Sequence, residues 1–355
     1  MNNSGRKKND AETMLDDDIV RMANHDEHLH IIRAGCAEKG FYYRYKNGKR
    51  VTKAKVLARI DRLVIPPNWR SVRISKLPKA SIQAIGKDEK DRRQYIYHCQ
   101  WHKQQQAEKF ASLCQFGLAI EEFRQLCFRY LETNEWSLDR ACALVGLLLD
   151  KTGARIGHAQ YTQENSTYGL STLRRKHAEV REDRILFKYT GKHNKPRTLE
   201  ITDPTLSTLV AECINLQGYA IFRYQADDAK WRDLTSEDMN HFIHQHMSDD
   251  YSCKYFRTWA ASRIALRVLP EVDASVNARK NRKWAPTLAK HVSKLLGNTA
   301  VVCRKYYIHP KLFAVIEDKE MRSELISNVN SILGQKCEEA SKDVRLERLL
   351  LKVIS

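Results

Sequence analysis

The sequence predicts an α+β protein, in which a small β-rich N-terminal domain precedes a larger, mostly α-helical domain with one embedded β-hairpin. Aromatic and β-branched residues alternate with basic ones before residue 101, and helical periodicity dominates after it. One stretch within the helical part has the pattern of two strands around a turn. The 355 residues are enough for two cores. We therefore expect a mobile polar tail at 1–28, the β-rich domain at 29–101 and the helical domain at 102–355.

Short elements separated by turn signals make up the predicted N-terminal domain. Asn47-Gly48 in GFYYRYKNGKR is typical of a hairpin turn. The stretch KAKVLARIDRLV is helical in pattern and ends before Pro66-Pro67. Three further segments, SVRIS, SIQAIG and RRQYIYH, have the composition of strands.

The larger domain is predicted from two helical stretches and a hairpin. QQQAEKFASLCQFGLAIEEFRQLCFRYL and SLDRACALVGLLLDKTG have helical periodicity, and in the second Ser137 is the expected N-cap with Asp139 in the first turn. DRILFKYTGKHNKPRTLEIT instead predicts two strands that flank a Gly-Lys-His-Asn turn.

Net charge and cysteine spacing limit the classes of binding partner and the cellular compartment that the sequence predicts. Lys+Arg 61 against Asp+Glu 43 gives a net charge of +18, which favours an extended polyanion as partner. The basic residues are spread along the chain and not gathered on one amphipathic helix, so nucleic acid is favoured over a membrane surface. The nine cysteines are scattered without a Cys-x-x-Cys, and the N-terminus MNNSGRKKND lacks the apolar core of a secretion signal. These features predict a cytoplasmic protein without a disulfide scaffold or zinc ribbon.

Metal-free cleavage of a nucleic-acid strand needs a nucleophile, cations on the phosphate oxygens and an acid for the leaving oxygen. Tyrosine suits the first role, arginine the second and lysine the third. The candidates are Arg155, Lys192, Arg257, Tyr306 and Tyr307. Taken singly, each is more often structural or solvated than catalytic, so composition and spacing alone do not select them.

Ordered sequence blocks decide between these alternatives. LLLDKTGARIGHAQYTQENSTYGLSTLRRKH, YTGKHNK, YFRTWAAS and LLGNTAVVCRKYYIHP occur in an order and form that resemble the signature blocks of the type IB DNA topoisomerases, especially the small bacterial, poxvirus-like branch. KRVT, RLVIPPNWRSVRIS and IQAIGKDEKDRRQYIYH resemble that branch as well. The resemblance extends from about residue 38 to 312, and it implies the catalytic fold that these enzymes share with tyrosine recombinases.

The resemblance also implies a role for each block residue. Arg155 and Arg257 would clamp the scissile phosphate, Lys192 would protonate the departing 5′ oxygen and Tyr307 would be the nucleophile. Poxvirus enzymes carry a histidine where this chain has Asn298, whereas small bacterial members resemble this chain. An amide donates a hydrogen bond without adding charge, so we expect Asn298 to act more weakly than histidine.

Only one of the two adjacent tyrosines is expected to act. In a helix, successive side chains point about 100° apart, so a single tyrosine can face the phosphate. The family tyrosine stands two positions after the lysine of this block, which favours Tyr307 and leaves Tyr306 to pack or to touch DNA.

A second DNA-contacting surface is expected in the N-terminal domain. In a strand, Tyr95 and Tyr97 share one face and Gln94 lies on the other. The resemblance implies that this segment, with Arg92, contacts the major groove, where glutamine can read a base edge. Without the resemblance, a half-buried strand with exposed aromatics would be an equally good interpretation.

Three rival interpretations remain. Tyrosine recombinases usually carry a histidine three residues before the second arginine, where this chain has Lys254, and IPPNW and RRQYIYH have no recombinase counterpart. A non-enzymatic DNA-binding protein would have no reason to hold these residues in family order. The histidines of HFIHQH (His241, His244 and His246) lack the ligand spacing of a metal enzyme and predict a wet helix surface.

The function implied is relaxation of positive and negative supercoils through a 3′-phosphotyrosyl intermediate, strand rotation and religation. Neither a nucleotide cofactor nor an essential metal is expected. The partner is double-stranded DNA, clamped by a monomer with salt-dependent affinity. No membrane association is expected, and the location is cytoplasmic and nucleoid-associated.

Overall fold

The structure is a computed structural model that describes residues 28–279 and 281–355. It divides into two compact units, Met1–Glu108 and Lys109–Ser355, which are described separately. The predicted tail lies outside the described residues, apart from His28. The predicted domain boundary between residues 101 and 102 falls inside helix α2 (Cys99–Ala111), and it stays a prediction.

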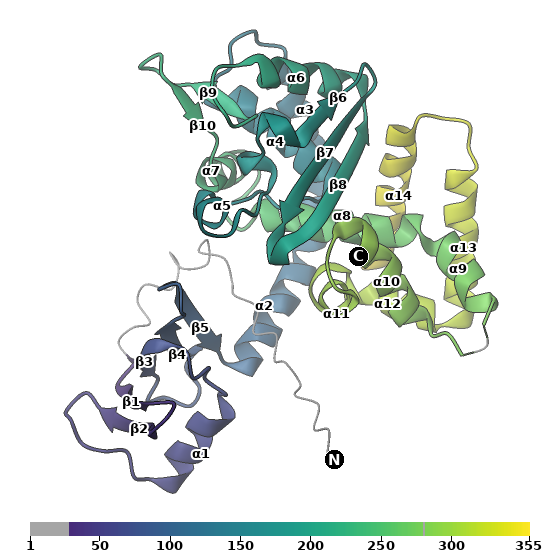
Figure 1. Cartoon of the computed structure of the whole chain (residues 1–355). Coiled ribbons are helices and arrows are strands. Elements are labelled where there is room, and N and C mark those ends of the chain that lie inside the picture. The colour runs from purple at the N-terminus through teal and green to yellow at the C-terminus, as the bar shows by residue number, and fades with distance from the viewer. Residues whose placement is uncertain (1–27, 280) are drawn as a thin grey trace, which may run out of the picture. The chain divides into compact units, whose positions relative to one another are not determined.

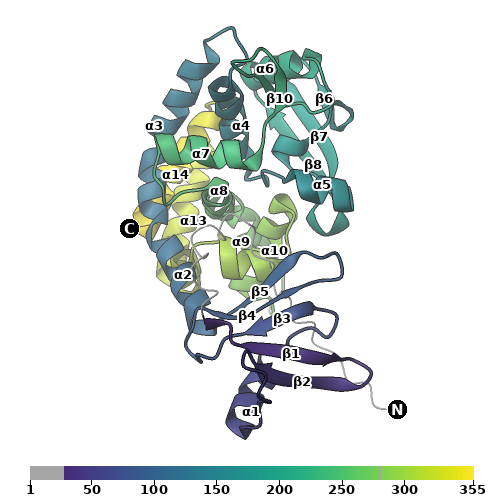
Figure 2. The ribbon, with the colours of Figure 1, turned by 90° about the vertical axis from the view of Figure 1, so that its left-hand side faces the viewer.

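The first unit contains an antiparallel five-stranded sheet in the order β2-β1-β3-β4-β5, the short helix α1 and most of α2 (Figure 2). Its elements are β1 Ile31–Cys36, β2 Gly40–Tyr45, α1 Ala54–Arg62, β3 Arg70–Ile74, β4 Ile82–Lys87 and β5 Arg93–Tyr97. Ile60 of α1 is buried with Ile31 and Ile74 of the sheet. Helix α1 ends before Pro66-Pro67, as predicted.

The hairpin differs from the predicted one. Asn47 and Gly48 do turn the chain, with Gly48 at φ 85° and Tyr45 N donating to Lys49 O at 2.8 Å. The turn closes only an isolated bridge between Arg44 and Arg50. The long hairpin is formed upstream by β1 and β2, and strand β1 was not predicted. A turn dipeptide therefore marks where the chain reverses, whereas the partner strand is set by the sheet.

The second unit is mostly helical, which confirms the α+β class with a small β-rich part and a larger helical part. Its helices are α3 Leu113–Leu131, α4 Leu138–Thr152, α5 Ala159–Asn165, α6 Pro204–Asn215, α7 Ser236–His246, α8 Cys253–Arg267, α9 Leu269–Asn277, α10 Trp284–Leu296, α11 Ala300–Val302, α12 Pro310–Glu317, α13 Lys319–Leu333 and α14 Glu339–Ile354. Ser137 caps α4 by accepting from Arg140 N at 3.2 Å, with Asp139 in the first turn. The helical stretch at 104–131 is interrupted at Ser112, between α2 and α3.

The embedded hairpin is present where the sequence predicts it (Figure 1). Strands β7 (Arg184–Gly191) and β8 (Lys195–Thr202) pair antiparallel, and β6 (Ala178–Val180) adds a third strand. A short turn at Lys192–Asn194 joins β7 to β8. A second, small pair is formed by β9 (Arg223–Gln225) and β10 (Trp231–Asp233).

Helix α8 lies in the core of the second unit and carries Arg257. Phe256 and Trp259 are fully buried, and both pack against Phe116 of α3 at ring centroid distances of 5.1 Å and 6.3 Å. Apolar anchors on both sides of Arg257 in sequence therefore fix the helix rotation that aims its guanidinium.

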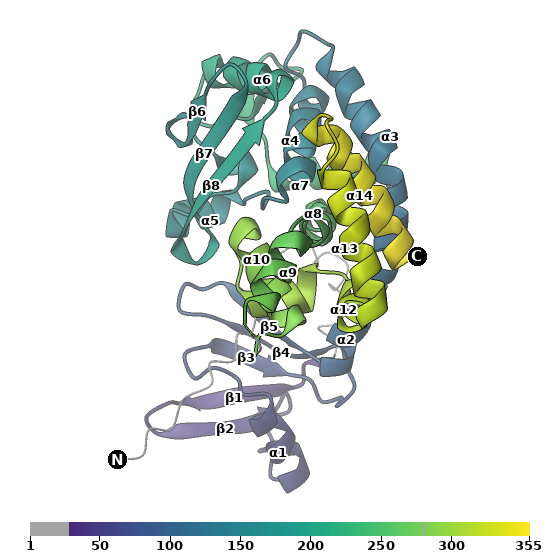
Figure 3. The same cartoon turned by 90° about the vertical axis from the view of Figure 1, so that its right-hand side faces the viewer.

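A network of ion pairs and hydrogen bonds connects helix α14 to helix α8. The views agree in showing α13 and α14 as neighbouring C-terminal helices (Figure 3). Glu347 of α14 is 4% exposed and accepts hydrogen bonds from Arg124 of α3, and from Trp259 and Arg263 of α8. The last helix therefore supports α8 through buried charge.

The histidines of HFIHQH lie on α7. His241 is exposed, while the ring of His246 packs on Phe242 at 4.6 Å between centroids. Within residues 28–279 and 281–355, no three His, Cys, Asp or Glu side chains are grouped to hold a metal ion. None of the helices in this part of the chain is long and apolar enough to cross a membrane.

Candidate active site

Two helix C-termini hold the guanidinium of Arg257. Helices α4 and α10 each end in a left-handed glycine, Gly153 at φ 58° and Gly297 at φ 66°. Arg257 is 4% exposed; its Nη1 donates to the Gly153 carbonyl and its Nη2 donates to the Leu296 carbonyl at 2.6 Å. The last carbonyls of a helix lack intrahelical partners and attract cations. A Cβ on Gly153 would lie 2.7 Å from Ala260 Cβ, so this cap requires glycine.

Arg155 and Asn298 follow these two caps and meet each other. Arg155 Nη2 donates to Asn298 Oδ1. Asn298 Nδ2 and Arg257 Nε are buried and have no hydrogen-bond partner among the described residues. Unsatisfied buried donors are costly, and an anionic oxygen is the acceptor that compensates them best. The arrangement is therefore suited to bind a phosphate.

The positive charge at this place is concentrated and buried. Burial, together with the neighbouring charges of Arg155 and Arg197, lowers the pKa of Arg257 to about 9, although Tyr307 opposes this shift. The guanidinium remains protonated at neutral pH. A nearby anion favours the charged form, so phosphate binding would relieve the repulsion.

A π-helical turn carries Tyr307. Ile308 N donates to Cys303 O at 3.0 Å, five residues earlier, which defines the turn at Cys303–Tyr307. Ser262 of α8 fixes its end, because its Oγ accepts from His309 N at 3.1 Å and donates to Tyr307 O at 3.4 Å. The tyrosine segment and Arg257 are thus attached to the same helix.

The two tyrosines have different surroundings. Arg257 Cζ lies 5.2 Å from the ring centroid of Tyr307. Lys109, a residue of α2, places its Nζ 5.7 Å from the same centroid. Lys109 Nζ also donates to the Tyr306 carbonyl. The Tyr306 ring instead has Lys305 Nζ at 4.8 Å. The Tyr307 ring therefore contacts the buried arginine, and the Tyr306 ring contacts a lysine of its own turn.

Lys192 lies at the tip of the β7–β8 hairpin and is half-buried. The next two residues, His193 and Asn194, have left-handed φ values of 63° and 55°. The structure brings Arg155, Arg257, Asn298 and Tyr307 together. The hairpin that carries Lys192 is connected to α10 by Arg197. Arg197 Nη2 donates to Leu295 O at 3.1 Å.

Sequence reasoning missed Lys109, Ser262 and Arg197. Strand alternation could have found Arg197, because it shares the inward face of β8 with Leu199 and Ile201. Lys109 and Ser262 carry no comparable signal, since their contacts depend on the fold.

The predicted DNA surface lies on β5 of the first unit. Tyr95 and Tyr97 stack with centroids 5.9 Å apart. Gln94 is buried, and its amide donates to Asp88 Oδ2 at 3.0 Å. Arg92 Nη2 is 2.7 Å from the same carboxylate. Burial alone would raise the pKa of Asp88, but hydrogen bonds from Arg92 outweigh it and the pKa is lowered. Asp88 therefore orients both polar side chains at neutral pH.

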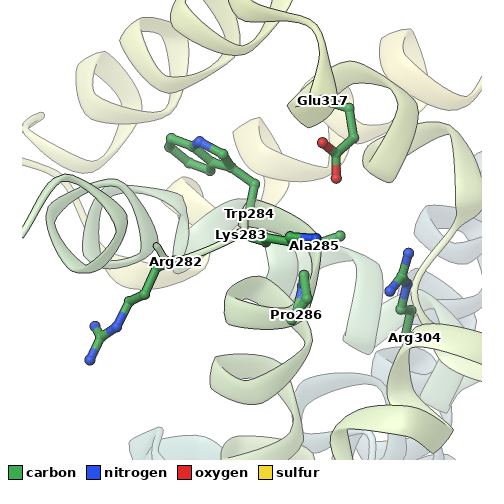
Figure 4. Close-up of a pocket in the computed structure, with 7 residues that line it drawn as sticks. All are labelled: Arg282, Lys283, Trp284, Ala285, Pro286, Arg304 and Glu317. Atoms are coloured by element: carbon green, nitrogen blue, oxygen red, sulfur yellow. The ribbon is translucent and has the colours of Figure 1, made fainter. Parts of the chain in front are cut away.

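A hollow of about 540 Å³ lies beside the tyrosine segment (Figure 4). It is lined by Arg282, Lys283, Trp284, Arg304 and Glu317 among others, and Figure 4 shows Arg282 pointing away from Arg304 and Glu317. Its charges are mixed and do not converge. The convergent donors around Arg257 make the better phosphate site.

Comparison with known families agrees with this geometry. Residues 98–330 match the family described as eukaryotic DNA topoisomerase I, catalytic core, and residues 40–88 match the bacterial DNA topoisomerase IB N-terminal domain. The chain belongs to the type IB DNA topoisomerases. Both matches are to topoisomerase families, which decides against the recombinase and the plain DNA-binding protein.

Similar proteins include three topoisomerases. The chain is 27% identical to the DNA topoisomerase 1B of Acanthamoeba polyphaga mimivirus over 300 residues, 81% of this chain and 88% of the relative. It is 31% identical to the vaccinia virus DNA topoisomerase 1B over 110 residues, 30% and 34% of the two chains. It is 24% identical to the DNA topoisomerase 1 of Mycosarcoma maydis over 192 residues, 49% and 19% of the two chains.

The buried histidine that follows Tyr307 predicts a pH dependence of stability. His309 Nε2 lies 3.2 Å from the Phe110 carbonyl and must donate to it, while Nδ1 accepts from Lys311 N at 3.2 Å. The ring is therefore neutral, and burial lowers its pKa. Because the unfolded state then binds more protons, the free energy of unfolding should fall as the pH drops below about 6.5.

Urea denaturation between pH 5 and pH 8 measures this slope. In His309→Asn the loss of stability below pH 6.5 should be smaller than in the wild type, whatever the variant's stability at pH 8. Equal slopes in the two proteins would contradict the assignment.

Proposed function

We propose that this type IB topoisomerase cleaves one DNA strand with Tyr307, and that Arg155, Arg257 and Asn298 bind the scissile phosphate. The phenolic oxygen attacks phosphorus, the phenol loses its proton and the bond to the 5′ oxygen breaks. The product is a 3′-phosphotyrosyl ester. Arginine forks bind two phosphate oxygens, and donors aimed at developing charge stabilise the transition state.

Lys192 is proposed as the acid that protonates the departing 5′ oxygen. The free end then rotates, positive and negative torsion are both released, and attack by the 5′ hydroxyl on the ester reseals the strand. The ester conserves the bond energy, so the reaction requires no ATP. It also needs no essential metal, because the cations of the site are side chains.

Binding to duplex DNA is proposed to involve both units. Gln94, Tyr95 and Tyr97 on β5, with Arg92 directly before the strand, contact the major groove, and the protein acts as a monomeric clamp. We place it in the cytoplasm with the nucleoid. Tyr95 and Tyr97 offer aromatic contacts to bases, and Gln94 can make bidentate contacts to adenine once its amide releases Asp88.

The observation that carries the proposal is the contact between Tyr307 and Arg257, at 5.2 Å from ring centroid to Cζ, beside buried unpaired donors.

Trapping the covalent protein–DNA intermediate tests the proposal. Supercoiled plasmid is incubated with the protein in EDTA without ATP, denatured rapidly and digested. Peptide mass spectrometry should find the nucleotide on Tyr307.

A nucleotide on Tyr306 would reassign the nucleophile and leave the reaction class intact. Absence of any adduct from a protein that relaxes the plasmid under the same conditions would overturn the covalent mechanism.

A further inference from the structure

Arg197 connects the Lys192 hairpin to the end of helix α10. The side chain starts on β8, is 9% exposed and donates through Nη2 to Leu295 O at 3.1 Å, across 98 residues of sequence. Its guanidinium packs on Gly297, where any Cβ would overlap it. Gly297 directly precedes Asn298. One arginine thus joins the hairpin to the segment that enters the phosphate site.

The same side chain supports the hairpin near its tip. In the register of the sheet Arg197 lies opposite Tyr189, and Gly191 lies opposite Lys195. A Cβ on Gly191 would lie 2.9 Å from Arg197 Cγ, so the arginine stem packs directly on the residue before Lys192. The tip contains two left-handed residues, a conformation that persists only when its surroundings determine it.

The positive charge of Arg197 also destabilises the charged form of its neighbour Arg257. It lowers the pKa of Arg257, as Arg155 does, so both of these guanidinium groups repel the buried guanidinium of Arg257. In the free protein the α10 C-terminus, with Leu295 O and Leu296 O, partly compensates two of them. Such a local conflict is expected where function requires it.

We propose that Arg197 is a positioning residue for strand cleavage, which fixes Lys192 against the 5′ oxygen by locking the tip end of the hairpin onto α10. The inference rests on the proposed role of Lys192 as acid. In the reaction, Tyr307 Oη bonds to phosphorus, the bond from phosphorus to the 5′ oxygen breaks, and this oxygen takes the proton of the Lys192 ammonium. The phenolic proton passes to water.

A substrate with sulfur in place of the bridging 5′ oxygen separates positioning of the acid from general damage. A thiolate is a far weaker base than an alkoxide and leaves without a proton. A protein that has lost only its acid, or the placement of its acid, therefore cleaves the sulfur substrate normally. A protein with a distorted phosphate site cleaves both substrates slowly.

The experiment measures single-turnover cleavage of matched oxygen and sulfur duplexes by four variants. Arg197→Gln should cleave the oxygen duplex about 100-fold more slowly, the cost of a misplaced group, and the sulfur duplex at nearly the wild-type rate. Arg197→Lys, which keeps the charge, should be intermediate on oxygen. Lys192→Ala is the reference for loss of the acid. Arg184→Gln is the matched control, because Arg184 is on the same sheet and pairs with exposed Asp183 and Glu200.

The outcomes distinguish the inference from the proposed function. If sulfur restores neither Lys192→Ala nor Arg197→Gln, the acid role of Lys192 fails and the inference fails with it. If sulfur restores Lys192→Ala but leaves Arg197→Gln slow, only the inference fails. Wild-type cleavage of the oxygen duplex by Arg197→Gln would also overturn it. Should Arg197→Gln not fold, the oxygen-to-sulfur comparison is made with Arg197→Lys.

Discussion

Tyr307→Phe should abolish relaxation of supercoiled plasmid, and Tyr306→Phe should retain it. Removing the phenolic oxygen removes the nucleophile, and the loss of a nucleophile that works with other groups is roughly 10⁴-fold or more. The Tyr307 ring contacts Arg257, whereas the Tyr306 ring contacts Lys305. Time courses of plasmid relaxation in EDTA without ATP, resolved on agarose gels, measure both variants.

Tyr306→Phe is the matched control, because it removes the same atom from the adjacent residue. DNA binding by both variants should stay close to that of the wild type. Activity in Tyr307→Phe together with inactivity in Tyr306→Phe would move the nucleophile by one residue. Activity in both would show that neither phenol forms the ester.

Glu347→Gln should lower the free energy of unfolding by about 3–5 kcal/mol, the usual effect of removing one partner from a buried ion pair. The substitution leaves Arg263 buried, with 6% of its side chain exposed, and weakens the acceptor for Arg124 and Trp259. Burial alone would raise the pKa of Glu347, but Arg124 and Arg263 lower it. Chemical denaturation at pH 7, where this carboxylate is ionised, measures the change.

Glu339→Gln on the same helix provides the comparison. Glu339 pairs with Arg267 at 2.6 Å, but 64% of its side chain is exposed, so its loss should cost under about 1 kcal/mol. Equal effects of the two substitutions would contradict a buried network that ties α14 to α8. The family match to the catalytic core ends at residue 330, so α14 lies beyond it.

Local signals predicted the elements that depend on few neighbours. Ser137 caps α4, the prolines at 66 and 67 follow the end of α1, and the turn after Gly191 joins the predicted pair of strands. Each depends on residues within a few positions, where caps, proline and strand alternation act directly. Strand β1 escaped prediction because its partner strands, and not its own six residues, stabilise it.

The sequence by itself determined the family and the candidate residues. The chemistry requires particular residue types, and Arg155, Lys192, Arg257 and Tyr307 each lie in a short motif that can be recognised without the fold. Their assembly was decided by tertiary structure. The contact of Arg155 with Asn298 spans 143 residues and the contact of Arg124 with Glu347 spans 223. The carbonyls that hold Arg257 and Arg197 are ordinary backbone atoms, and they become ligands only because α4, α8, α10 and the hairpin pack together. Every residue has a backbone carbonyl, so the sequence does not indicate which carbonyls bind these arginines, and only the folded chain identifies them.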